Sequence, residues 1–135
     1  MPRFIVLEHR DAPDDPQGLH FDLLLEEGQA CRTWRLSALP MPDGQSVGAV
    51  EIAPHRLSWL THVSGAVSGG RGEATRVATG TFERFDAPSP HDHDRVLVDL
   101  AVTSDTLSWP KAPTIRLVFS RTDAPQTWRV TASAP

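Results

Sequence analysis

The sequence predicts an all-β fold, a single small β-barrel of about eight to ten mostly antiparallel strands. Short runs of β-formers recur between turn signals, and no segment shows the 3.6-residue apolar period of an amphipathic helix. The 12 prolines are accommodated more easily in turns than in helices. A barrel is favoured over a sandwich because closure removes exposed sheet edges. A chain of 135 residues is expected to form one domain, 1–135, because a second core would leave each half too little apolar surface.

The first three predicted strands form a meander over 4–9, 19–27 and 30–37. The loop 10–18, rich in Pro, Asp and Gly, separates the first two, and a tight reversal at 27–29 joins the second to the third. Trp34 and Leu36 fall on one face of the third strand.

A second group of strands surrounds Pro54. The Pro-rich connection 39–44 leads to strands predicted over 47–52 and 56–62, with Pro54 at an edge or turn because it cannot donate a ladder hydrogen bond. The segment 64–72 holds four glycines. That density predicts a loop that passes close to a ligand or to another backbone segment.

The remaining strands are predicted over 73–85, 95–102, 115–120 and 127–132, with a kink at Gly80. In the second of these, three apolar residues alternate with their neighbours: Val96, Val98 and Leu100. The intervening loop carries the sequence His91-Asp92-His93-Asp94. We interpret it as a solvated turn, because a Pro-flanked loop lacks the fixed scaffold of a selective metal site.

Charge and composition narrow the choice of partners and compartment. A net charge of −4 and a pI near 5.8 argue against coating nucleic acid by bulk attraction, although 12 of the 13 basic residues are Arg and a local basic groove stays open. The single cysteine, Cys31, cannot form an internal disulfide, which favours a reduced, cytoplasmic setting. The apolar run at the N-terminus is too short for a signal peptide or a membrane span. We expect a monomer without membrane contact.

Candidate metal ligands lie at the junction of the first two strands. Alternation puts His20, Asp22, Leu24 and Glu26 on one face of the second strand, away from the aliphatic core formed by the other face. If the first strand pairs with it, His9 lies beside His20. Two imidazoles and one carboxylate suit Mn, Zn, Fe or Co and leave positions for water or phosphate. By spacing alone, a His or Asp near a strand end is more often a solvated or structurally hydrogen-bonded residue than a metal ligand.

The same residues resemble a known family. Glu8-His9, then Leu19-His20-Phe21-Asp22 and Leu25-Glu26, is similar to the His and Leu-His-Tyr-Asp-x-x-Leu-Glu pattern of the 3′-phosphoesterase domain of bacterial DNA ligase D. Later segments agree in order from the N-terminus to about residue 130: Trp34, the stretch 51–59, the loop 67–72, the sequence Gly80-Thr81-Phe82-Glu83, and the closing strands with Trp128.

The resemblance implies a function and a set of site residues. It implies that His9, His20 and Asp22 bind Mn²⁺, with Zn²⁺ or Co²⁺ as alternatives, and that His55 contacts the scissile phosphate. His9 and His55 are the expected catalytic residues, and Trp59 is expected to stack on a terminal base or sugar. The implied activity is removal of a terminal ribonucleotide or phosphate from nucleic-acid 3′ ends in DNA repair, with a DNA ligase or other end-joining proteins as partners.

The sequence departs from the family pattern at several positions. Leu24 and Val47 stand where the family has phosphate-binding arginines, and Trp59 replaces a tyrosine. Arg35 and Arg71 are candidate replacements for binding substrate, or are solvated surface arginines. The acidic insert 11–18 either lengthens the loop without effect or repels a phosphodiester.

Two other functions stay open beside the hydrolase. One is a binding module of the same fold, which holds nucleic-acid ends or a repair partner without catalysis. The other is a hydrolase or metal protein that acts on a small phosphorylated molecule.

Overall fold

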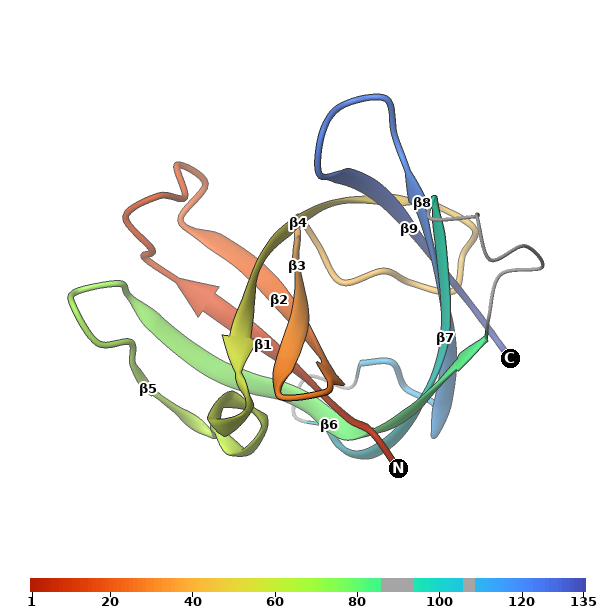
Figure 1. Cartoon of the computed structure of the whole chain (residues 1–135), viewed down its shortest axis with the longest axis horizontal. Helices are drawn as coiled ribbons and strands as arrows, with labels where there is room; N and C mark the ends of the chain where they lie inside the picture. The colour runs from red at the N-terminus through yellow and green to blue at the C-terminus, as the bar shows by residue number, and fades with distance from the viewer. Residues whose placement is uncertain (86–93, 106–108) are drawn as a thin grey trace.

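The computed structural model describes residues 1–85, 94–105 and 109–135, and the all-β prediction is confirmed. Nine strands of the described chain form one sheet, and eight of them close into an antiparallel barrel because β6 pairs with β1 (Figure 1). The short strand β5 adds to β6 outside the closed barrel. The strands are β1 (Arg3–Arg10), β2 (Leu19–Glu27), β3 (Ala30–Leu36), β4 (Val47–Arg56), β5 (Ser64–Ala66), β6 (Glu73–Phe85), β7 (Arg95–Asp105), β8 (Thr114–Arg121) and β9 (Thr127–Ser133).

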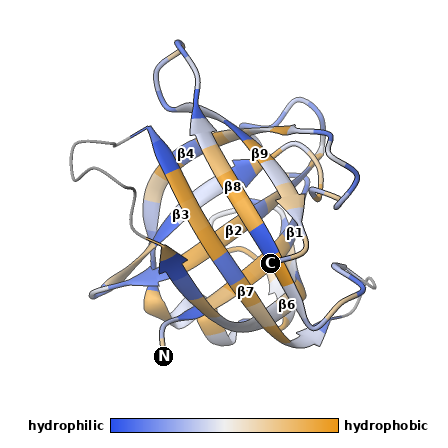
Figure 2. Ribbon diagram, turned by 90° about the vertical axis from the view of Figure 1, so that its right-hand side faces the viewer, coloured by the Kyte–Doolittle hydropathy of each residue, from blue (hydrophilic) through white to orange (hydrophobic). Residues whose placement is uncertain are grey.

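Alternate residues of the strands fill the barrel interior, and the strands carry most of the hydrophobic residues (Figure 2). Leu23 and Leu25 point inward from β2, as predicted, and the alternating valines and leucine of β7 do the same. Trp34, Trp109 and Trp128 are each at most 1% exposed. The three are therefore core residues, in agreement with the sequence-based expectation.

A second, smaller apolar cluster lies on the outer face of the same strands. It consists of Ile5, Leu7, Leu24, Cys31 and Leu60. Leu60 comes from the 3₁₀ helix η1 (Leu57–Thr61), which covers this face. The outer face of β2 therefore carries one apolar residue, Leu24, between the polar residues Asp22 and Glu26, whereas the sequence pattern predicted that this whole face points away from any aliphatic core.

The prediction of a strand over 56–62 is wrong. Strand β4 continues through Pro54 to Arg56, and the chain then forms η1. The reason is that β4 pairs with β9 only over Val47–Val50, so its far end is a sheet edge from which the chain turns to cover the outer cluster. Pro54 lies at this edge, where the β3–β4 register shifts, and its predicted position is confirmed.

The glycine-rich segment 64–72 begins as β5 and then turns back to β6. Gly72 has a φ of +86°, and a side chain there would overlap the carbonyl oxygen of Arg10. The predicted close approach therefore exists, and it is made to the backbone that follows β1. The predicted kink at Gly80 is also present, as a register shift between β6 and β7.

Residues 91–93 of the predicted solvated turn lie outside the described residues. Across the ranges that the structure describes, no helix combines the length and the hydropathy needed to cross a membrane.

Candidate metal centre

Three predicted ligands come together on the outer face of β1 and β2. The antiparallel register places His9 directly opposite His20, as expected, and Asp22 follows two residues later on the same face. One ligand atom from each side chain can be chosen so that all three lie within 4.8 Å of one another. The strand pairing alone brings these three groups to one point.

His9 is oriented by the glycine-rich loop. Its Nε2–H donates to the carbonyl oxygen of Arg71 at 2.7 Å, which leaves Nδ1 facing Asp22 Oδ2 at 3.6 Å. The close packing of Gly72 against Arg10 holds that loop beside the end of β1. The backbone of one loop thus fixes the direction of the first imidazole.

His20 is oriented by the loop between β1 and β2. Its Nδ1–H donates to Asp15 Oδ2 at 2.8 Å, and its Nε2 lies 3.4 Å from Asp22 Oδ1. Only 3% of the His20 side chain and 8% of the Asp15 side chain are exposed. The second imidazole therefore presents its Nε2 to the same carboxylate.

The residues of this cluster fit a divalent metal ion. His20 Nε2 and Asp22 Oδ1 are buried and have no hydrogen-bond partner among the described residues. Buried polar atoms in native proteins are rarely left in that condition. Atoms that bind one ion at about 2.0–2.2 Å lie about 3–4 Å apart, and the 3.4 and 3.6 Å separations at Asp22 match that spacing.

The electrostatics of the cluster favour an ionised carboxylate. Burial opposes ionisation of Asp22, but its contacts with His20 and His9 outweigh burial and hold its pKa at about 2. The contact with Asp22 raises the pKa of His9 above its ordinary value, against the effect of burial. The hydrogen bond from His20 lowers the pKa of Asp15. Both carboxylates are thus charged at neutral pH.

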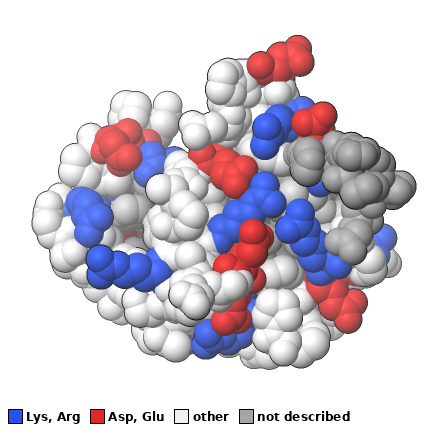
Figure 3. Space-filling view, viewed as in Figure 1, with Lys and Arg blue, Asp and Glu red and all other residues white. Residues whose placement is uncertain are grey.

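A pocket of about 980 Å³ opens beside the cluster. Its cationic residues among those described are Arg35, Arg56 and Arg71. On the face in Figure 3 the Lys and Arg side chains are interspersed with Asp and Glu, so positive charge does not dominate that face. Positive charge is therefore available inside the pocket rather than across that face.

Arg35 lies directly opposite Asp22 in the β2–β3 register. Its Nη2 donates to Asp14 Oδ2 at 3.3 Å, whereas its Nε is buried without a hydrogen-bond partner among the described residues. Arg71 lines the same pocket from the glycine-rich loop, and its guanidinium donates to the carbonyl oxygen and the hydroxyl of Ser68. Both arginines thus line the pocket, Arg35 as a half-buried residue and Arg71 as an exposed one.

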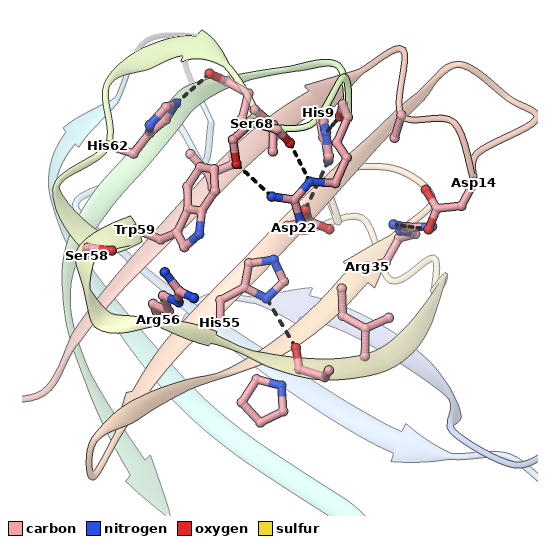
Figure 4. A pocket seen from close by; sticks show the side chains of 18 of the residues that line it. His9, Asp14, Asp22, Arg35, His55, Arg56, Ser58, Trp59, His62 and Ser68 are labelled. Atoms are coloured by element: carbon pink, nitrogen blue, oxygen red, sulfur yellow. Dashed lines mark hydrogen bonds and ion pairs between the residues drawn. The ribbon is translucent and has the colours of Figure 1, made fainter.

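His55 and Trp59 line the pocket from β4 and η1. His55 points toward Asp22, and the rings of His55 and Trp59 lie 6.2 Å apart (Figure 4). His62, which was predicted to lie in a strand, has its ring centre 4.8 Å from that of Trp59, with the two rings tilted, and it lines the pocket as well. Of the seven site residues predicted from sequence, all line this pocket except His20, which is buried.

Two positions that depart from the family pattern lie away from the pocket lining. Leu24 is fully buried in the outer apolar cluster, and Val47 packs against the barrel core. Sequence reasoning missed Asp14, Asp15 and His62. The sequence shows carboxylates a few residues before a candidate ligand. The direction in which such a side chain points depends on the conformation of the loop, which the sequence pattern does not give.

Comparisons with known proteins do not identify this chain. No family model matches it, and a search of curated proteins finds no significant match.

Proposed function

We propose that this chain is a metal-dependent phosphoric ester hydrolase that processes nucleic-acid 3′ ends, as the resemblance to the 3′-phosphoesterase domain of bacterial DNA ligase D implies. One observation carries the proposal: His20 Nε2 and Asp22 Oδ1 are buried without a hydrogen-bond partner among the described residues, face each other at 3.4 Å and lie beside His9. A pocket with arginines next to this cluster supports an anionic substrate. The 3′-hydroxyl product is the end that a DNA ligase or other end-joining proteins require.

In this proposal His9, His20 and Asp22 hold a divalent cation, with Mn²⁺ as the first choice and Zn²⁺ or Co²⁺ as alternatives. Such an ion supplies Lewis acidity, neutralising phosphate charge and activating water. His9 therefore belongs to both the ligand set and the catalytic group.

The pocket residues have distinct proposed roles. His55, which points toward Asp22, donates a hydrogen bond to a phosphate oxygen or a proton to the leaving group. Arg35 and Arg71 bind phosphate oxygens in place of the family arginines. Trp59 stacks on the terminal base or sugar.

The test is release of phosphate from a primer-template with a 3′-phosphate, in the presence of Mn²⁺ and with a chelator as control. Manganese-dependent release is expected, and His55→Ala should lower the rate by about 10²–10⁴-fold while leaving metal affinity unchanged. A protein that binds Mn²⁺ but turns over no 3′-phosphorylated end would contradict the proposal. Turnover of small phosphate esters, with no preference for a polynucleotide, would reassign the substrate.

The second candidate is a binding module that keeps the metal but does not catalyse. Leu24 and Val47 favour it, because neither family arginine is present and neither position faces the pocket. Such a module binds 3′ ends equally with His55→Ala and wild type, and it has no rate to lose. Equal binding with no turnover would select this candidate.

A further inference from the structure

Asp15 makes a short contact with a proposed metal ligand, and the loop that carries it is internally bonded. The carboxylate accepts from two donors: Oδ1 from the backbone N–H of Gln17 at 2.9 Å, and Oδ2 from His20 Nδ1–H at 2.8 Å. Backbone hydrogen bonds also join Asp15 to Ala12 and to Gly18. Asp15 is thus a fixed acceptor rather than a solvated loop carboxylate.

This contact determines which nitrogen of His20 can bind a metal. An imidazole that donates from Nδ1 keeps its lone pair on Nε2. In this structure Nε2 is the buried atom without a hydrogen-bond partner among the described residues, and it lies 3.4 Å from Asp22 Oδ1. Reversal of the tautomer would point an N–H at the metal position.

We propose that Asp15 is a positioning residue that holds His20 in the tautomer and orientation needed to bind a divalent metal, so that the loop between β1 and β2 is a working part of the site. The inference rests on the proposed metal site. Outer carboxylates of this kind typically change metal affinity by about 10–100-fold when removed. The acidic insert therefore has a role that neither a neutral spacer nor a repulsive loop would have.

Asp15→Asn is the informative substitution. The amide oxygen can still accept from Gln17 N–H, which preserves the turn, while the amide NH₂ donates to His20 Nδ1 and favours the wrong tautomer. The matched control is Asp14→Asn, which removes the same charge from the same loop but from a residue that pairs with Arg35. The metal affinity of the Asp14→Asn variant should stay within about threefold of wild type, because an exposed ion pair contributes little free energy.

Two measurements test the inference. Titration with Mn²⁺, followed by calorimetry or by the electron paramagnetic resonance of free Mn²⁺, should show a loss of about 10–100-fold for Asp15→Asn. Nitrogen-15 shifts of His20 in the metal-free protein at about pH 8 should show Nδ1 protonated in wild type and Nε2 protonated in Asp15→Asn.

The outcomes separate this inference from the proposed function. If wild type binds no Mn²⁺, the proposed function fails, and the positioning role fails with it for this metal. If wild type binds Mn²⁺ and Asp15→Asn binds equally well, only the role of Asp15 is overturned. The wild-type nitrogen shifts need no variant to fold, and a proton on His20 Nε2 there would also overturn the role.

Discussion

The two faces of strand β2 are buried in different ways. Leu23 and Leu25 pack into the barrel core, where their neighbours are other apolar side chains. His20 and Asp22, on the outer face, are also buried, but each has an atom without a hydrogen-bond partner among the described residues. A buried polar atom without a partner destabilises a fold by about 1–3 kcal/mol. The inner face therefore serves stability, whereas the outer face includes a group of side chains that could hold a metal ion.

The largest expected effect comes from removing the shared carboxylate. Asp22→Asn keeps the shape of the side chain but removes the charge that both imidazoles face, so Mn²⁺ affinity should fall by more than about 100-fold, beyond the range typical of outer-shell changes. Titration of metal into purified protein measures this. Wild-type affinity in the variant would show that the outer face does not hold the metal through Asp22.

The next effect concerns stability. Leu23→Ala, in the barrel core, should lower the free energy of unfolding by about 2–5 kcal/mol. Leu24→Ala, in the small outer cluster, should lower it by an amount near the lower end of that range. The smaller loss is expected because the layer under η1 can relax around the missing atoms. Urea denaturation of both variants measures the difference. A larger loss for Leu24→Ala would reverse the assignment of the two faces.

Metal binding should weaken as the pH falls. The pKa of His9 is raised by Asp22, so His9 takes up a proton at higher pH than a free imidazole does, and that proton competes with the metal. Asp22, with a pKa of about 2, stays ionised and adds no competing proton. Below the His9 pKa, Mn²⁺ affinity should drop by about tenfold per pH unit for each proton displaced. Affinity that is constant between pH of about 5 and 8 would exclude imidazole ligation.

The smallest effect is expected at Asp14. This residue is 71% exposed in its side chain and pairs with Arg35 at 3.3 Å. Asp14→Asn frees the guanidinium for an anion, and inorganic phosphate should bind up to about fivefold more tightly because an exposed ion pair contributes at most about 1 kcal/mol. Phosphate titration monitored by nuclear magnetic resonance checks this. Weaker phosphate binding in the variant would indicate that Arg35 does not face the anion.

Much of the fold followed from local pattern. The alternation in β7 and the turn residues between strands predicted the barrel, because burial of one face imposes a period of two. The pairing of His9 with His20 followed from the same reasoning. The helix η1 did not, since Leu57, Trp59 and Leu60 also fit a short strand, and only the open edge of β4 decides between them.

The site was predictable in part for a similar reason. His9, His20 and Asp22 lie on paired strands whose register brings them together. Asp15 lies in a loop, where no period applies and direction depends on turn hydrogen bonds that involve residues such as Ala12 and Gly18. The apolar surroundings of Leu24 were hidden in part, because Leu60 joins them from η1, more than thirty residues later in the chain.

Cys31 gives this arrangement a built-in reporter. It is the chain's only cysteine, is 0% exposed, and lies in the outer cluster with Leu60 of η1. Burial raises the pKa of its thiol, so both access and ionisation limit its alkylation. The rate of thiol labelling therefore reports local opening of η1, the segment that carries Trp59. A ligand that binds in the pocket and stabilises the closed position of η1 would lower that rate, so no probe has to be introduced.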